Sequence, residues 1–474
     1  MKQKCSKQDL LINGSISKAL IWFALPLLGS SFIQLLYNAV DLIFIGNYVG
    51  KSASAAVGSG SLLLTCLVGF ITGISVGAGV VVAQYYGAKD YKNLQDSVHT
   101  AMSLAGIGGI VLTIAGLLLS PFILQWLRVP QEIFELSVSY IRIYFISILP
   151  MVLYNMGSAI LRAYGDAKRP LIYLASGAIL NVFLDWLFVA VFSWGVAGAS
   201  WATTISQTLS AVLIVVHLFR TKREYRIHLK RLRIHKKQMM RIVKLGVPAG
   251  IQSSLLTISN MVVQFYINGF GQDAMAAFTA YFKVENFMYL PILAFGQAMT
   301  SFVGQNIGAG QLKRVKKGVK IGLLLGVSCT IAVSTIVLLS RYYLFRMFNS
   351  ELEVIQCGIQ ILMITAPVYF IYVAIEVLSG TVRGAGASFI PMVISISHLC
   401  ILRIILLAII VPLWNSVQAI AIVYPITWAA TAFSLFTINV FDGEIRLSRY
   451  SVINLFLWNK NKESDCFDSR IFTI

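Results

Sequence analysis

Residues 82–98, VAQYYGAKDYKNLQDSV, and residues 303–319, VGQNIGAGQLKRVKKGV, decide the fold of this 474-residue chain. Gln84 in the first segment corresponds to Gln305 in the second, 221 residues later. Three further pairs keep the same offset: Gly87 and Gly308, Ala88 and Ala309, and Val98 and Val319. A register held over four identities predicts that the chain contains two copies of one structural unit.

The repeat extends beyond these two segments. Residues 161–170, LRAYGDAKRP, match residues 382–391, VRGAGASFIP, again at an offset of 221. Pro26 and Pro248 lie 222 residues apart. The repeat therefore covers most of the chain.

The composition indicates that each repeated unit is a membrane bundle. Hydrophobic residues make up 57% of the chain, charged residues 12%, and the mean hydropathy is +0.78. A membrane-spanning helix needs ~20 mostly apolar residues. Such windows recur, as in residues 102–127, 171–191, 321–339 and 390–411. We expect an all-α integral membrane protein with about twelve spans, six in each half.

An even number of spans per half returns the chain to its starting side, so the two repeats are parallel and enclose a central cleft. The expected organisation is a first six-helix lobe over residues 1–219, a basic linker over 220–244, a second lobe over 245–441 and a tail over 442–474.

The Lys and Arg residues behind the net charge of +19 are unevenly distributed across the membrane. With alternating spans, all but seven of the 38 Lys and Arg residues fall on one side. Cytoplasmic loops carry such an excess, which places both termini in the cytoplasm of a multi-pass protein of the inner (plasma) membrane and argues against nucleic acid as a partner. The six cysteines are dispersed and show no disulfide or metal-site spacing.

Enzyme signatures are not convincing. The segment GISVG, residues 73–77, fits the pattern of a nucleophile elbow, but it lies inside an apolar span. Its small residues instead predict close helix packing. No P-loop is present to bind ATP, so we expect no enzyme activity, no cofactor and transport driven by an ion gradient.

Carboxylates inside spans are functional candidates, because burying their charge is costly. Asp41 and Asp185 fall at similar depths on the first and fifth spans. Tyr37 and Asn181 each lie one helical turn before one of these carboxylates, and Thr203 reaches a similar depth on the sixth span. We expect these five polar groups to converge. The alternative is that both carboxylates lie at span ends and are simply hydrated.

Other features leave two interpretations open. The second half offers a candidate polar site of four residues, Glu376, Lys283, Glu285 and Arg403, which suit a structural ion pair as well as a transport role. Pro26 either kinks its helix or provides a hinge. The matched glycines of the repeat are interpreted as chain turns.

Taken in order, several segments resemble the multidrug and toxic compound extrusion (MATE) transporters. The similarity covers residues 15–442 and is carried by residues 14–50, 82–90, 161–170 and 181–189. It implies two six-helix lobes with a cavity that opens alternately to each side. It also implies export of small organic cations against inflow of protons or sodium, by a protein expected to be a monomer in membrane lipid.

The chain is more similar to the DinF-like branch, in which the first lobe carries the ion site. The resemblance implies that Asp41, Asn181, Asp185 and Thr203 bind the coupling ion, and that Gln34, Tyr37 and Tyr140 line the substrate cavity. In the NorM-like pattern, acidic residues of the seventh and tenth spans bind the cation. Residues 245–269 contain no Asp or Glu here, which argues against that pattern.

The resulting hypothesis is that Asp41 and Asp185 alternate between binding the coupling ion and favouring substrate, while the first helix bends near Pro26. The second candidate function is a flippase for a lipid-linked or amphiphilic intermediate. A passive channel is the third.

Overall fold

The computed structural model describes residues 10–49 and 51–441, and all the regular secondary structure in these ranges is helical. The tail predicted over 442–474 lies outside the described residues. The first half contains α1 (Leu10–Asn13), α2 (Ile16–Tyr48), α3 (Lys51–Gly87), α4 (Tyr91–Trp126), α5 (Gln131–Ile146), α6 (Ile148–Ala163), α7 (Lys168–Asp185), the π-helical η1 (Trp186–Val191) and α8 (Gly195–Arg220).

The second half repeats this order after a short connection with the 3₁₀ turn η2 (Leu229–Arg231). It contains α9 (Lys236–Asn268), α10 (Gln272–Gly308), α11 (Leu312–Leu339), α12 (Arg341–Arg346), α13 (Leu352–Thr365), η3 (Ala366–Val368), α14 (Phe370–Gly384), α15 (Phe389–Ser395), the π-helical η4 (Ile396–Leu402), α16 (Arg403–Leu413) and α17 (Val417–Phe441).

Ten helices in the described part of the chain are long and apolar enough to cross a membrane. Two further spans are bent pairs: α5 with α6 at 40°, and α13–η3 with α14 at 52°. Counting each pair as one span gives twelve, as predicted. Continuous helices suit lipid because they satisfy their own backbone hydrogen bonds.

The repeat is visible in the backbone. The bent span is the fourth of each half, and a π-helical segment interrupts the fifth span of each half. Gly165 and Gly386 both adopt positive φ, at 90° and 94°, and Lys89 and Gly310 do so at 55° and 71°. Both pairs keep the 221-residue offset, so the matched turns fold alike.

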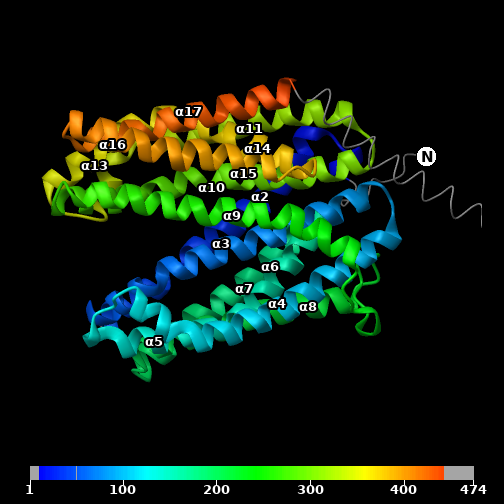
Figure 1. Cartoon of the computed structure of the whole chain (residues 1–474), viewed down its shortest axis with the longest axis horizontal. Helices are drawn as coiled ribbons and strands as arrows, with labels where there is room; N and C mark the ends of the chain where they lie inside the picture. Colours follow the sequence, from blue (N-terminus) through cyan, green and yellow to red (C-terminus); the bar gives the residue numbers. More distant parts are fainter. Residues whose placement is uncertain (1–9, 50, 442–474) are drawn as a thin grey trace, which may run out of the picture.

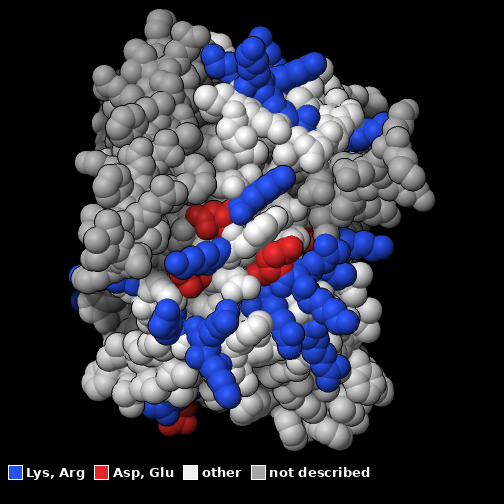
Figure 2. All heavy atoms as spheres, turned by 90° about the vertical axis from the view of Figure 1, so that its right-hand side faces the viewer, with Lys and Arg blue, Asp and Glu red and all other residues white. Residues whose placement is uncertain are grey.

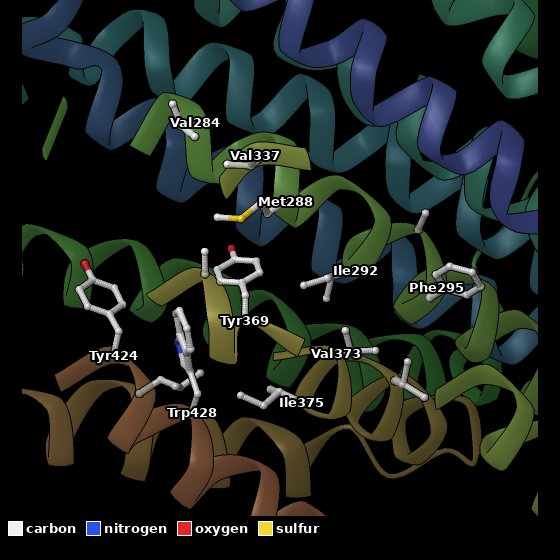
Figure 3. Packing of buried hydrophobic residues seen from close by; sticks show 14 of the residues in the cluster. Val284, Met288, Ile292, Phe295, Val337, Tyr369, Val373, Ile375, Tyr424 and Trp428 are labelled. Carbon is white, nitrogen blue, oxygen red and sulfur yellow. The ribbon is translucent and has the colours of Figure 1, made fainter. Parts of the chain in front are cut away.

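Figure 1 shows the halves as two bundles, one coloured blue to green and the other green to red. Each bundle has its own large apolar core. Figure 3 shows part of the second core, where the Tyr369 and Trp428 rings meet edge to face at 5.1 Å. The first helix of each half crosses over: Leu20 of α2 packs in the second core, and Ile242 of α9 packs in the first.

We call the end of the molecule that carries the α3–α4, α8–α9 and α10–α11 connections the basic end, and the opposite end the far end. Figure 2 looks onto the basic end and shows Lys and Arg over much of its described surface, with a small acidic group among them. The last part of the predicted linker 220–244 is helical, because α9 begins at Lys236. Basic residues in the first turns of α9 interrupt its apolar pattern, so the sequence does not show where this helix begins.

Helices α3 and α9 join the two bundles through small residues. A Cβ atom on Gly73 would lie 2.1 Å from the Gly250 nitrogen, and one on Gly77 would lie 2.4 Å from the Gly246 nitrogen. These contacts are too close for any side chain. The interpretation of residues 73–77 as a packing motif is thus confirmed.

Candidate functional site

The polar residues predicted on α2, α7 and α8 come together inside the first bundle. The Thr203 hydroxyl donates a hydrogen bond to Asp41 Oδ2 at 3.1 Å, and the Tyr37 hydroxyl donates to the Thr203 carbonyl at 3.2 Å. The Asp41 carboxylate also adjoins the side chains of Asp185 and Asn181. Helical spacing explains this, since Tyr37 precedes Asp41 by one turn and Asn181 precedes Asp185 by one turn.

The site is almost closed to solvent. Asn181 and Asp185 are 0% exposed and Thr203 is 8% exposed. Five buried atoms make no hydrogen bond in the described structure: Asp41 Oδ1, both Asp185 carboxylate oxygens, and the amide oxygen and nitrogen of Asn181. Buried carboxylates with unsatisfied oxygens need a proton or a cation to offset their charge.

The oxygen atoms suit a light cation. Asp41, Asp185, Asn181 and Thr203 offer carboxylate, amide and hydroxyl oxygens from three helices, which are the ligands that hard cations prefer. Within the described residues, no cluster of three or more His, Cys, Asp or Glu side chains could hold a metal ion. Because all of its donors are oxygen atoms, the site fits a proton or sodium better than a transition metal that prefers nitrogen or sulfur ligands.

The local backbone is irregular at this point. The π-helical turn η1 begins at Trp186, directly after Asp185. Isolated π-helical turns inside α-helices are frequent at functional sites. The sequence gives no indication of η1, because no residue pattern marks a π turn.

The three residues predicted to line the substrate cavity differ in exposure. Tyr37 is buried in the carboxylate site, Tyr140 is half-buried beside it and Gln34 is exposed. Tyr144, one turn beyond Tyr140, also faces Asp41 and was not predicted. The four-residue spacing of Tyr140 and Tyr144, which places both side chains on one helix face, could have indicated this neighbour of the site.

Of the four charged residues predicted in the second lobe, Glu285 lies near Arg403, and Glu376 shares the neighbouring Tyr372 with both. Glu376 pairs with Arg383 at 3.3 Å, and Glu285 accepts a hydrogen bond from the Tyr369 hydroxyl at 3.2 Å. Lys283 is exposed, with its ammonium 5.2 Å from the centre of the Phe348 ring. These contacts match the structural alternative for Glu376 and Glu285.

Arg403 is the buried cation of the second lobe. Its side chain is 4% exposed, donates to Asn260 Oδ1 at 3.2 Å and lies 4.7 Å from the centre of the Tyr424 ring. A π-helical turn, η4, ends directly before it. The second lobe thus carries a tethered cation next to its π turn, at the position that corresponds to Asn181 at the 222-residue offset.

Pro26 lies just before the point where α2 changes its neighbours, since Leu27 still packs in the core of the second bundle. Residues before it, such as Leu20 and Phe23, pack in the core of the second bundle. Beyond it, Tyr37 and Asp41 contact α8 of the first bundle. Proline removes one helical hydrogen bond, so α2 is weakened where it passes from one lobe to the other.

Comparison with known proteins gives consistent results. The family model MatE matches the chain twice, over residues 26–187 and 248–409. "Probable multidrug resistance protein YpnP" of Bacillus subtilis (strain 168) is 30% identical over 391 residues, covering 82% of this chain and 87% of that protein. "Multidrug export protein MepA" of Staphylococcus aureus (strain MW2) is 25% identical over 395 residues, covering 80% and 86%.

Solved structures share the fold. A structure described as the "Outward-facing conformation of a multidrug resistance MATE family transporter of the MOP superfamily" aligns with a TM-score of 0.87 at 23% identity, over 94% of this chain and 99% of that one. A MATE structure "in the straight conformation" gives 0.87, and one "in the bent conformation" gives 0.83, both at 22% identity. The former covers 94% of this chain and 99% of that one, and the latter 95% and 99%.

The two family matches begin at Pro26 and Pro248, the repeat-related prolines, and together span more than half of the chain. Efflux rather than lipid flipping is the function of this family, and its antiport is coupled to a cation. The repeat, the two bundles and these matches lead to one conclusion: the chain belongs to the MatE family and is a multidrug efflux transporter of the membrane, not an enzyme.

Proposed function

We propose that Asp41, Asn181, Asp185 and Thr203 form the ion-coupling site of this transporter, in the first lobe alone. The observation that carries the proposal is the pair of adjoining buried carboxylates, whose remaining oxygens make no hydrogen bond. Either a proton or sodium offsets their charge. Within the family, this arrangement corresponds to the DinF-like branch.

The cargo is a small organic cation. It reaches the site through the cavity lined by Gln34, Tyr37 and Tyr140. A cationic substrate and the coupling ion both stabilise the ionised Asp41–Asp185 pair, so each disfavours binding of the other. This competition converts ion entry into substrate release, and it is the basis of antiport.

Ion binding is coupled to movement of α2. The site holds the part of α2 beyond Pro26, while the part before it stays in the second bundle. Neutralising the carboxylates changes the packing of α2 against α7 and α8, and Pro26 is where the helix bends. Bending shrinks the cavity and expels the cargo.

The basic end lies in the cytoplasm, so the N-terminus and the α8–α9 connection are cytoplasmic and the protein belongs to the inner (plasma) membrane. The excess of Lys and Arg at this end supports the orientation. The C-terminus follows on the same side after an even number of spans. The transporter works as a monomer, because the two lobes that pack against each other belong to one chain.

The test is efflux of a fluorescent organic cation from vesicles under an imposed ion gradient. Asp41→Asn and Asp185→Asn each remove one carboxylate with little change of shape, and we expect both to reduce efflux to the rate measured without a gradient. Asp273→Asn is the matched control, because Asp273 is exposed at the far end of α10. Gradient-driven efflux at the wild-type rate in both site variants would contradict the proposal.

Imposing a pH gradient and a sodium gradient separately identifies the coupling ion. Only one of the two gradients should drive efflux in the wild-type protein, and that dependence should disappear in both Asp variants. An unchanged ion dependence in the variants counts against the site.

A further inference from the structure

Helices α3 and α10 cross at the basic end, on the axis that relates the two halves. Ala83 of α3 and Gly304 of α10 occupy equivalent positions in the repeat. A Cβ atom on Gly304 would lie 3.0 Å from that of Ala83. Residues that touch their own repeat equivalents lie on the symmetry axis, so this crossing is the centre of the contact between the lobes.

Two glutamines next to the crossing make reciprocal hydrogen bonds. Gln84 Nε2 donates to the Gly384 carbonyl at 3.0 Å, and Gln305 Nε2 donates to the Ala163 carbonyl at 2.8 Å. Both donors and both acceptors are related by the 221-residue offset. Each bond therefore joins a side chain of one lobe to the backbone of the other.

The backbones around these bonds are in direct contact. A Cβ atom on Gly87 would lie 1.9 Å from the Gln305 carbonyl oxygen, and one on Gly308 would lie 2.0 Å from the Gln84 carbonyl oxygen. No residue other than glycine fits at either position without separating the lobes. The matched glycines, interpreted from sequence as turns, are here close-contact positions.

The two halves of this contact are not equally strong. Arg241 of α9 donates to Gln84 Oε1 at 3.1 Å, also donates to the Tyr85 hydroxyl, and lies over the Tyr85 ring at 4.8 Å. Gln305 Oε1 is buried and has no hydrogen-bond partner. At the 222-residue offset, the position equivalent to Arg241 is Ala19, which has no donor to offer.

We propose that Gln84 and Gln305 are positioning residues of the transport cycle, which together hold the basic-end side of the pathway closed and must part for substrate to enter. Neutral amide–carbonyl bonds suit this role, because water replaces them at little net cost when the side opens. The Gln84 half is the stronger one, and the Gln305 half opens more readily.

The closure is separate from the ion-coupling site. It involves α3, α6, α10 and α14 at the basic end, and none of the side chains that surround Asp41. The test below needs no ion gradient. Its failure would leave the proposed coupling site intact, and failure of the Asp variants to lose coupling would leave the closure intact.

The experiment measures the separation of the lobes at the basic end. Lys92 of α4 and Lys313 of α11 are exposed repeat equivalents in different lobes. Lys92→Cys and Lys313→Cys receive spin labels in a full-length chain whose six native cysteines are replaced by alanine. Pulsed electron paramagnetic resonance then gives the distance distribution in lipid nanodiscs.

Gln84→Met and Gln305→Met keep the side-chain length but remove the amide donor. We expect each to increase the long-distance population relative to the short one, by about three- to tenfold per lost hydrogen bond. Gln84→Met should act more strongly, because it also removes the acceptor of Arg241. Gln264→Met is the matched control, since the Gln264 amide bonds only to Asn268 on the same exposed helix face.

Gln84→Glu provides a second, near-isosteric variant in case Gln84→Met folds poorly. It keeps an acceptor for Arg241 but cannot donate to the Gly384 carbonyl in its ionised form, so it should also open the basic end. Distance distributions that match the control in all of these variants would overturn the proposal. An equal or larger opening with Gln305→Met would overturn the assigned order of strength.

Discussion

The proposed ion-coupling site of the first lobe and the equivalent positions of the second lobe carry different side chains. At the 222-residue offset, Asp41 corresponds to Val263 and Asn181 to Arg403. At an offset of 221, Thr203 corresponds to Tyr424. Asp185 corresponds to Leu406 or Leu407, depending on the offset.

The contacts show what this difference does. In the first lobe, buried carboxylates have no tethered cation beside them among the contacts described above. In the second lobe, the Arg403 guanidinium lies 4.7 Å from the Tyr424 ring, the equivalent of Thr203. A covalently attached cation cannot exchange with solvent, whereas a proton or sodium can. Under the proposed function, only the first lobe therefore exchanges an ion.

The largest effect is expected when the first lobe receives the charged residue of the second lobe, so that an arginine like Arg403 replaces Asn181. Asn181→Arg places a tethered cation beside Asp41 and Asp185, which offsets their charge permanently. We expect loss of gradient-driven efflux while the protein still reaches the membrane. Vesicle efflux and surface abundance are the two measurements.

Asn181→Gln is the control for side-chain length in that position, and it should retain more efflux than Asn181→Arg. Equal activity in the arginine variant and the wild type would show that the carboxylates do not need an exchangeable ion.

Thr203→Val removes the hydroxyl that donates to Asp41 without changing the side-chain shape. A hydrogen bond to a charged group contributes about 1.5–3 kcal/mol. We therefore expect the apparent affinity for the coupling ion to change by roughly ten- to a hundredfold. The ion concentration that gives half-maximal efflux measures this effect, and Thr203→Ser should restore most of the wild-type value.

The two repeat-related prolines sharpen the comparison of the lobes. Pro26→Ala restores the missing helical donor in α2, so we expect slower ion-driven efflux, by a few-fold. Pro248→Ala makes the same change in α9. No ion-coupling site is proposed on α9 beyond Pro248, so this variant should have a smaller effect on the efflux rate. Initial efflux rates at saturating gradient compare the two, and a larger effect of Pro248→Ala would count against a hinge at Pro26.

The smallest effect on coupling is expected from Glu376→Gln in the second lobe. Glu376 is paired with Arg383 at 3.3 Å, and both side chains are mostly buried. Loss of this pair should lower the unfolding temperature and leave the ion dependence of efflux unchanged. Thermal unfolding in detergent and efflux at several ion concentrations separate the two effects, and a shifted ion dependence would give Glu376 a role in coupling.

Helical spacing made much of the first-lobe site predictable. Tyr37 with Asp41 and Asn181 with Asp185 each share a helix face, and their depths follow from the rise of the helix. The recurring apolar windows, divided by the repeat, likewise gave six spans per half. Both inferences depend on periodicity alone, which a single sequence contains.

Features that depend on contact between helices could not be predicted. The hydrogen bonds of Gln84 and Gln305 end on backbone carbonyls, which leave no mark in the sequence of their partner segments. The π turn after Asp185 has no residue signature. The start of α9 at Lys236 could not be predicted, because its first turns are basic rather than apolar.

The most direct test of the central claim is ion-triggered release of a bound fluorescent cation from the purified protein. The double variant Glu285→Gln/Glu376→Gln removes two half-buried carboxylates of the second lobe, and Asp41→Asn/Asp185→Asn removes the adjoining carboxylates of the first. The account predicts that adding the coupling ion still displaces the dye from the second-lobe variant and no longer does so from the first-lobe variant. Ion-triggered release that survives in the first-lobe variant, or is lost from a folded second-lobe variant, would contradict it.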